Sequence, residues 1–212
     1  MQSNYNPLAY EFIKRGFDLT LASIGLVLLA PLMLAIALLI KVDSKGPIIY
    51  RGRRSGMDFS VFEIYKFRTM VTDAEAIGGA VTAKNDSRVT RPGKLLRKYK
   101  LDELPQLFNV LAGEMSVVGP RPEVPLYTSR YTEKEKVILS VKPGITDYSS
   151  IYFVQLANTL GTADNKTQFE KNIDEVLKAK TELRLKYVAE RSTATDIKIM
   201  FLTVVKLLKG FK

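Results

Sequence analysis

The sequence predicts a mixed, helix-rich α/β protein with an N-terminal membrane helix in residues 1–45 and a small cytosolic domain in residues 46–212. Three observations lead to this fold class. Residues 19–40 are uncharged and mostly apolar, residues 46–68 hold two β-rich stretches around a turn signal, and the last third repeats its apolar residues at helical spacing. A short β-hairpin and amphipathic helices at the membrane interface are therefore expected in the second part.

The composition limits the chemistry of this domain. The chain has 212 residues, of which 46% are hydrophobic and 25% charged, enough for one domain with its own core. It contains no histidine and no cysteine, which excludes imidazole bases, thiolate nucleophiles, disulfides and the usual zinc ligands. Its net charge of +10 favours an anionic partner. Catalysis would then depend on carboxylates, lysines, hydroxyls or a bound oxophilic metal.

The uncharged run at residues 19–40 is long enough to cross a bilayer core about 30 Å thick. Pro31 lies near its middle, where it removes a helical N–H group and disfavours helical geometry at Ala30. The membrane helix is therefore expected to break at Ala30 and Pro31.

Basic residues flank this run on both sides, two just before it and five between residues 41 and 54. The positive-inside rule then keeps both ends cytoplasmic, so a re-entrant helix that enters and leaves on one face fits both the charges and the proline. Two alternatives stay open. A kinked single-pass helix would place the following domain in the cytosol, and a cleaved secretory signal usually has a shorter apolar region of about 7 to 15 residues.

The two β-rich stretches, residues 46–51 and 59–68, predict a hairpin with a turn at residues 55–58. Lys66 and Arg68 are two residues apart on the second stretch and therefore share a face. This spacing suits contact with two phosphate oxygens. Cationic side chains at the solvated end of a strand are the structural alternative.

A long loop is expected at residues 71–93, which hold two glycine-containing turn signals and few apolar residues. Residues 84–100 overlap it and carry seven basic residues, among them Arg88, against one acidic residue. An anion is expected here. No nucleic acid is expected, because Tyr99 is the one aromatic residue in this stretch and a stacking platform needs several.

The segment at residues 100–111 has apolar residues at helical spacing, and Pro105 is tolerated only in a first turn. A helix is therefore expected to begin at Asp102 or Glu103. A carboxylate at a helix N-terminus is favoured in its ionised form, which suits a nucleophile or a metal ligand. A plain N-cap followed by a first-turn glutamate is the structural alternative.

Two stiff turns supply further cations. In the first, Pro120 and Pro122 restrict the backbone around Arg121. The second is a Lys-Pro-Gly turn that begins at Lys142. Rigidly held cations suit phosphate recognition. Basic loops around one ionised carboxylate describe a phosphoryl-transfer site with a divalent cation.

Four segments carry a resemblance to a known family, in this order along the chain: YKFRTM at 65–70, RVTRPGKLLRK at 88–98, LDELPQLFNVLAGEMSVVGPRP at 101–122 and KPGIT at 142–146. Following a proline-broken membrane helix, this set resembles the monotopic phosphoglycosyl transferases, the bacterial sugar transferase family. The resemblance extends over nearly the whole chain, and the block at 101–122 is its most specific part.

The resemblance implies that Asp102 and Glu103 form a catalytic dyad that works with Mg²⁺ on a UDP-sugar and a polyprenyl (undecaprenyl) phosphate. Asp102 would attack the β-phosphate and expel UMP, leaving a phosphosugar on the aspartate for the lipid phosphate to take. Glu103 would bind the metal or act as an acid or base. The resemblance also places Lys66 and Arg121 near the nucleotide or phosphates.

The expected substrate contacts are then the five basic residues singled out above: Lys66, Arg68, Arg88, Arg121 and Lys142. The implied location is the cytoplasmic face of the bacterial inner membrane, in contact with membrane lipid. The implied role is the first membrane step of glycoconjugate synthesis, such as that of capsule or lipopolysaccharide.

Two departures from the family pattern limit what the resemblance transfers. After KPGIT the chain has Asp147 and Tyr148 where the commoner pattern has Gly-Trp, so altered donor specificity is expected. Arg184 stands where family members often carry an aspartate in a Leu-Asp-x-Tyr-Tyr run. No role of that aspartate transfers to this chain.

The C-terminal segment predicts a helix that starts near Ser192 to Asp196, with Asp196 expected to cap or pair structurally. One face of this helix is apolar: Ile197, Met200, Phe201, Val204, Val205 and Leu208. That face fits the membrane interface, the rest of the domain or a second subunit, so a homodimer stays open.

Two alternatives to an enzyme come from other functional classes. One is a catalytically silent, membrane-anchored scaffold that binds anionic lipid or a partner, and the other is a tethered nucleic-acid-binding domain. The intact Asp102 and Glu103 pair and the loop at Arg121 favour the enzyme.

Overall fold

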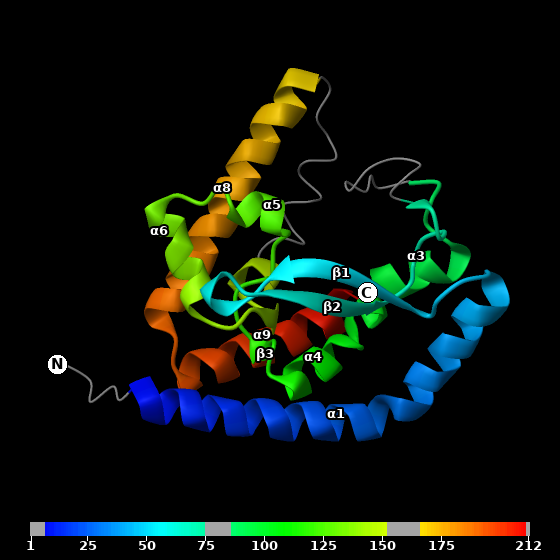
Figure 1. The fold of residues 1–212 in the computed structure, drawn as a ribbon, viewed down its shortest axis with the longest axis horizontal. Coiled ribbons are helices and arrows are strands. Elements are labelled where there is room, and N and C mark those ends of the chain that lie inside the picture. The colour runs from blue at the N-terminus through cyan, green and yellow to red at the C-terminus, as the bar shows by residue number, and fades with distance from the viewer. Residues whose placement is uncertain (1–6, 75–85, 152–165, 211–212) are drawn as a thin grey trace.

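The structure, a computed structural model, describes residues 7–74, 86–151 and 166–210. Its first element, helix α1, runs from Pro7 to Asp43 along one side of the molecule, and its second part bends toward the β-hairpin (Figure 1). Pro31 lies inside this helix, where the missing N–H group removes one helical hydrogen bond. The structure thus has one bent helix where the sequence predicts an interruption at Ala30 and Pro31.

Helix α1 is the one helix within the described ranges that is long and apolar enough to cross a membrane. Only 11% of its most apolar window is buried inside the protein, which is unlike the core helix of a soluble domain. Large apolar side chains are exposed along it, including Leu8, Phe12, Val27, Leu28, Leu34 and Val42. These features indicate membrane association.

The inner side of α1 completes two hydrophobic clusters of the remaining chain. Ala22 packs with Phe62 and Val110 in one, and Ile36 packs with Leu96 in the other. Helix α1 therefore packs in the same hydrophobic clusters as the hairpin, so a change in the position of α1 would also change the position of the hairpin.

The predicted hairpin is confirmed. Strands β1 (Ile49–Ser55) and β2 (Val61–Phe67) pair antiparallel, with Ile49 opposite Phe67 and Ser55 opposite Val61. The first strand begins at Ile49 instead of residue 46 and continues to Ser55. A 3₁₀ turn, η1 (Met57–Phe59), joins the strands with Asp58 at φ 52°, a left-handed conformation that aspartate tolerates better than most residues.

Helix α3 (Arg91–Lys98) begins inside the segment that the sequence predicts as a loop. The Thr90 side chain accepts a hydrogen bond from the Gly93 N–H group at 3.0 Å, and Pro92 occupies the first turn, where it needs no donor. These N-terminal signals outweigh the Pro-Gly turn signal. Residues 75–85 of the predicted loop lie outside the described residues.

After α3 come the 3₁₀ turn η2 (Leu101–Glu103) and helix α4 (Gln106–Ala112), which ends at Gly113 with φ 85°. Two short strands, β3 (Ser116–Val118) and β4 (Gly144–Thr146), then pair in parallel. Between them lie three short helical segments, α5 (Pro125–Thr128), α6 (Glu133–Lys136) and η3 (Val137–Ser140).

Two long helices complete the described chain. Helix α8 (Lys166–Glu190) runs past α6 and α5, and α9 (Thr193–Gly210) returns above α1 (Figure 1). They join a third apolar cluster of Val118, Tyr148, Tyr187 and Ile199. The predicted C-terminal helix is thus confirmed, with Ile197, Phe201 and Val204 exposed on its apolar face, while the side chain of Leu208 lies outside the described residues.

The backbones of β3 and β4 approach closely because two glycines face each other. A Cβ atom on Gly144 would collide with the backbone of Gly119. We expect Gly144→Ala to destabilise the fold by about 2 kcal/mol in thermal unfolding, because backbone cannot move aside as a flexible side chain can. Gly16→Ala is the control: its Cβ would meet nothing within 4 Å, so it should leave stability equal or higher. Equal melting temperatures for the two variants would contradict this account.

Candidate active site

The carboxylate pair lies in a tight turn between two helices. Lys100 has φ 57°, a left-handed conformation that is rare for a residue with a side chain, and it directs the chain from α3 into η2. Helix α4 begins at Gln106, after Pro105, and not at Asp102 or Glu103 as the sequence predicts. Pro105 sits at the cap position because its missing N–H group costs nothing there. The dyad therefore lies in a 3₁₀ turn that precedes the helix.

Glu103 is held by two cations. Its Oε1 atom accepts from Lys66 Nζ at 2.8 Å and from Arg121 Nη2 at 2.6 Å, and its Oε2 atom accepts from Arg121 Nη1 at 3.3 Å. Burial opposes the ionised form of Glu103, but Arg121 and then Lys66 outweigh burial and hold the pKa of Glu103 well below its usual range. The structure thus brings Lys66 and Arg121 to the dyad.

The pKa of Asp102 is shifted in the opposite direction from that of Glu103. Its side chain is buried, and burial followed by the neighbouring Glu103 carboxylate raises its pKa, against the opposing effect of Lys66 and Lys100. The expectation that a helix terminus favours ionised Asp102 is therefore wrong, because α4 begins only at Gln106 and burial disfavours the charge of Asp102.

Two buried polar atoms at this turn have no hydrogen-bond partner among the described residues: Asp102 Oδ1 and Gln106 Nε2. Buried polar atoms are normally paired, so an unpaired one needs an explanation such as a catalytic role or an absent ligand. Asp102 thus combines a disfavoured charge with an oxygen open to a new partner, as a nucleophile or ligand requires.

Arg68 lies away from the dyad. Strand β2 ends at Phe67, so the alternation that would align Arg68 with Lys66 does not continue. The Arg68 guanidinium instead donates to the carbonyls of Lys45 at 2.6 Å and Ser44 at 2.8 Å, just beyond the end of α1. It stabilises the orphan carbonyls at that helix terminus.

Arg88 and Lys142 are also separate from the dyad in the contacts that they make. Arg88 pairs with Asp86 at 2.7 Å and lowers the pKa of that carboxyl to about 2, and it donates to the Ala74 carbonyl at 2.6 Å. Lys142 lines a small pocket next to α1, where burial and then the nearby Arg15 lower its pKa. These contacts are structural, and a role of either residue in substrate binding stays a prediction.

Sequence reasoning did not single out Asn109, although it supports the site. Its buried side chain accepts from the Tyr65 N–H group at 2.9 Å and donates to the Glu63 carbonyl at 2.7 Å. It therefore pairs with the edge of β2 beside Lys66 and fixes α4 to the strand. Helical spacing could not have indicated it, because Asn109 lies on the opposite side of the helix from Leu104, Leu107 and Leu111.

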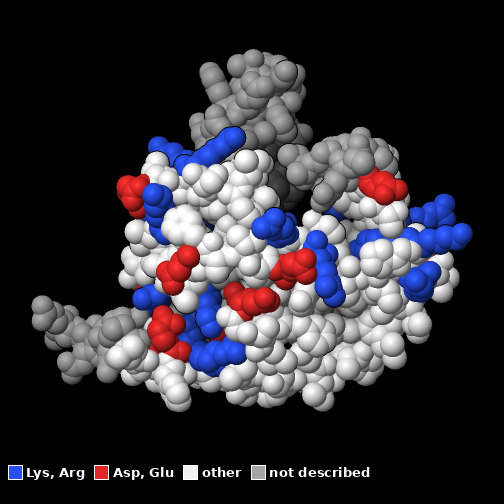
Figure 2. Space-filling model, viewed as in Figure 1, with Lys and Arg blue, Asp and Glu red and all other residues white. Residues whose placement is uncertain are grey.

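Charged side chains of both signs gather over the middle of the face in Figure 2, with few along the stretch of α1 beneath them. The chemistry that this arrangement supports is attack by a buried carboxylate at a phosphate held by cations. Residues 9–210 match the family described as bacterial sugar transferase.

The chain belongs to the bacterial sugar transferase family.

Named relatives of this bacterial sugar transferase act on undecaprenyl phosphate. UDP-glucose:undecaprenyl-phosphate glucose-1-phosphate transferase of Escherichia coli is 40% identical over 200 residues, which cover 92% of this chain and 40% of that protein. UDP-N-acetylgalactosamine-undecaprenyl-phosphate N-acetylgalactosaminephosphotransferase of Aeromonas hydrophila is 37% identical over 95% of this chain and 45% of its own length. The chain thus spans less than half the length of these two relatives.

A shorter relative matches almost throughout. Exopolysaccharide production protein PSS of Rhizobium leguminosarum is 37% identical over 94% of this chain and 98% of its own length. A protein of this family can therefore consist of little more than the segment that the present bacterial sugar transferase spans.

The two departures from the family pattern, Asp147 and Arg184, contact the loop that carries Arg121. Asp147 is buried and accepts from the Ser149 hydroxyl at 2.7 Å, and the Arg121 N–H group points to its Oδ2 atom at 3.4 Å. Arg184 donates to Glu123 Oε1 at 2.6 Å. Both departures therefore act on the loop that carries Arg121.

Proposed function

We propose that this protein transfers a sugar 1-phosphate from a UDP-sugar to undecaprenyl phosphate and releases UMP, with Asp102 as the nucleophile. The observation that carries the proposal is the buried Asp102 oxygen, without a partner among the described residues, beside the Lys66–Glu103–Arg121 ion cluster. The names of the relatives supply the substrate classes.

The reaction would proceed in two displacements. An Asp102 oxygen forms a bond to the β-phosphorus while the bond from that phosphorus to the bridging oxygen breaks, and UMP leaves with the bridging oxygen. An oxygen of undecaprenyl phosphate then attacks the same phosphorus, and the Asp102 carboxylate leaves. Lys66 and Arg121 offset the charge of the phosphate oxygens in both steps. Glu103, held ionised, keeps these two cations in place and is not suited to donate a proton.

Mg²⁺ is the proposed cofactor, and the donor set fits it in part. The described residues contain no cluster of three or more carboxylates, but Mg²⁺ usually takes one or two carboxylates and completes its shell with substrate phosphates and water. Asp102 Oδ1 is the oxygen of the dyad without a hydrogen bond among the described residues and would be its ligand, whereas both oxygens of Glu103 are in ion pairs. When bound, the ion would neutralise charge on the diphosphate.

The test is UMP release by the purified full chain from a panel of UDP-sugars, with and without undecaprenyl phosphate and with EDTA as a control. Sustained release with the lipid, and a burst of about one UMP per protein without it, would support transfer through an enzyme intermediate. An increase in the mass of the protein by one phosphosugar after the burst would identify the covalent intermediate. Lack of release from every donor, together with no nucleotide binding, would contradict the proposal.

We further propose that α1 re-enters, so that both of its ends lie on the cytoplasmic face of the inner membrane. Support comes from its bend, its exposed apolar side chains and the basic residues on both flanks. In this cysteine-free chain, Leu8→Cys and Lys45→Cys should both react with a membrane-impermeant thiol reagent from the cytoplasmic side only, and Leu28→Cys should stay unreactive. Labelling from opposite sides would contradict re-entry.

Lys66→Met should shift the acid limb of the pH–rate profile to higher pH. Lys66 favours ionised Asp102, whose pKa is already raised, so removing the cation raises that pKa further and the nucleophile protonates at a higher pH. We expect the rate at neutral pH to fall about 100-fold, since one charge-stabilising group is lost. Arg51→Met, which removes an exposed cation of β1, is the control; an unmoved acid limb in Lys66→Met would contradict the assignment.

A further inference from the structure

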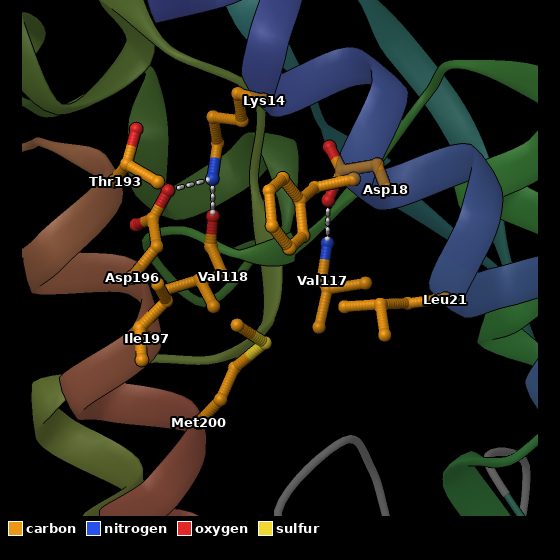
Figure 3. A pocket seen from close by; sticks show the side chains of 10 residues that line it. Lys14, Asp18, Leu21, Val117, Val118, Thr193, Asp196, Ile197 and Met200 are labelled. Carbon is orange, nitrogen blue, oxygen red and sulfur yellow. Dashed lines mark hydrogen bonds and ion pairs between the residues drawn. The ribbon is translucent and has the colours of Figure 1, made fainter.

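The carbonyl of Val118, directly before the loop of Arg121, is bound by side chains from outside that loop. Lys14 Nζ of α1 donates to it at 2.9 Å (Figure 3). The Tyr187 hydroxyl of α8 lies within hydrogen-bonding distance of the same carbonyl at 3.1 Å. We infer that Lys14 is a positioning residue through which the membrane helix sets the place of Arg121, and thereby of Glu103. This inference rests on the proposed function of the dyad.

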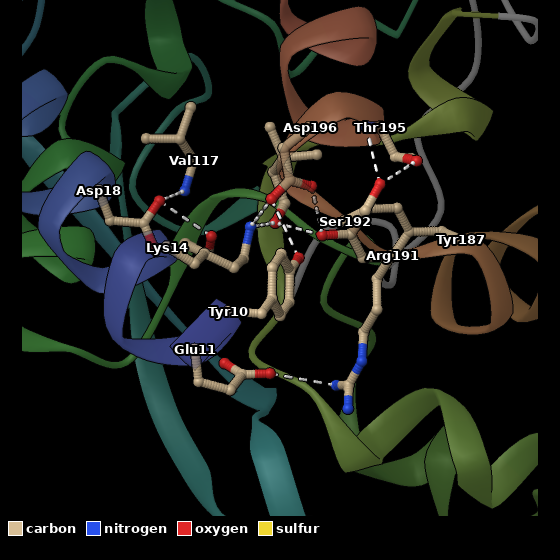
Figure 4. Close-up of polar contacts among 12 residues, drawn as sticks. Tyr10, Glu11, Lys14, Asp18, Val117, Tyr187, Arg191, Ser192, Thr195 and Asp196 are labelled. Atoms are coloured by element: carbon tan, nitrogen blue, oxygen red, sulfur yellow. Dashed lines mark hydrogen bonds and ion pairs between the residues drawn. The ribbon is translucent and has the colours of Figure 1, made fainter. Parts of the chain in front are cut away.

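Asp196 of α9 holds both donors in place. Its Oδ2 atom accepts from Lys14 at 2.7 Å and from the Tyr10 hydroxyl at 3.0 Å, and its Oδ1 atom accepts from Tyr187 at 2.8 Å (Figure 4). The Lys14 and Asp196 side chains are only 13% and 10% exposed, so water does not compete well for these bonds. Burial also raises the pKa of Tyr187, which therefore keeps its proton.

The Lys14 ammonium can donate three hydrogen bonds, so one proton can point at Val118 while another points at Asp196. The single proton of Tyr187 is shared between the same two acceptors. Lys14 is therefore the stronger determinant of where the Val118 carbonyl lies, and Tyr187 is the weaker one.

A displacement at Val118 would pass to Arg121 because the intervening backbone is stiff. The Gly119 N–H group donates to the Thr146 carbonyl at 3.0 Å, and the Pro120 carbonyl accepts from Gly144 at 2.9 Å. Pro120 and Pro122 fix their own φ angles and restrict the residues before them. With little freedom left to absorb a shift, the guanidinium of Arg121 moves with its backbone.

The first experiment is a double-mutant cycle on the full chain, read out as UMP release. If Lys14 acts through Arg121, Lys14→Met should slow release about 10-fold in the native background and less than about 2-fold in an Arg121→Met background. Lys14→Arg, which keeps the charge and can donate to both the Val118 carbonyl and Asp196, should recover part of the rate. Lys41→Met removes the same charge from the other flank of the membrane run and should leave the rate unchanged. Equal losses in both backgrounds would overturn the inference.

Amide hydrogen exchange at Gly119 and Arg121, the two residues of this stretch that have an N–H group, tests the same inference without turnover, so a failure of the proposed function stays distinguishable. Lys14→Met should speed exchange there, as should Tyr187→Phe, which serves if Lys14→Met does not fold. Tyr10→Phe is the matched control and should leave the exchange rate unchanged. The Tyr10 hydroxyl donates to Asp196, as the Tyr187 hydroxyl does, and not to the Val118 carbonyl. Exchange as slow in Lys14→Met and Tyr187→Phe as in the native chain would overturn the inference.

Discussion

Asp102→Asn should abolish UMP release and, at the same time, make the protein more stable. Loss of a nucleophile typically costs about 10⁴-fold or more in rate. The gain in stability follows from the raised pKa of Asp102: the folded state disfavours its charge, so at neutral pH the ionised carboxylate weakens folding. A neutral amide of the same size removes this penalty. Melting temperatures in detergent at pH 7 measure it, with an expected rise of a few degrees.

The stability gained by this variant should depend on pH. Below the ordinary aspartate pKa of about 3.9, Asp102 is protonated in both the folded and the unfolded states, so the stability difference between the native protein and Asp102→Asn should vanish there. Asp58→Asn is the control, because Asp58 is exposed and its left-handed backbone suits asparagine. A lower melting temperature in Asp102→Asn than in Asp58→Asn would contradict this reading of the site.

Glu103→Gln should instead lower both activity and stability. It leaves Lys66 and Arg121 next to each other without an anion, and burial followed by Arg121 already lowers the pKa of Lys66. Removing one partner of a buried ion cluster costs about 3 kcal/mol, and we expect that loss in denaturant unfolding at pH 7. UMP release should fall about 1,000-fold, because Arg121 and Lys66 lose their fixed positions.

Glu63→Gln is the matched control for this prediction. Glu63 is exposed on the hairpin and lies 3.7 Å from Arg51, so its loss should cost less than about 0.5 kcal/mol. Because the pKa of Glu103 is lowered by folding, its contribution should be complete above about pH 5 and decline as the pH falls through the ordinary glutamate range. Equal losses in the two variants would contradict a buried cluster.

The sequence allowed the hairpin, the long apolar helix and the convergence of Lys66 and Arg121 on the dyad to be predicted, because each depends on local pattern or on a specific motif. Arg68 could not be placed, since alternation holds only while a strand continues and β2 ends at Phe67. The raised pKa of Asp102 could not be predicted either. Its pKa depends first on burial, which segments distant in the sequence create.

The bonds of Arg68 to the end of α1 have a consequence for the acceptor. Lys66 and Arg68 are two residues apart, about 7 Å of extended backbone, so in the proposed function the lysine that would meet phosphate is tied to the end of α1 at nearly fixed reach. The depth of α1 in the bilayer would then determine how far Lys66 lies from the membrane surface. The phosphate of the proposed undecaprenyl phosphate acceptor would lie at headgroup level, so the proposed function predicts a rate that depends on bilayer thickness.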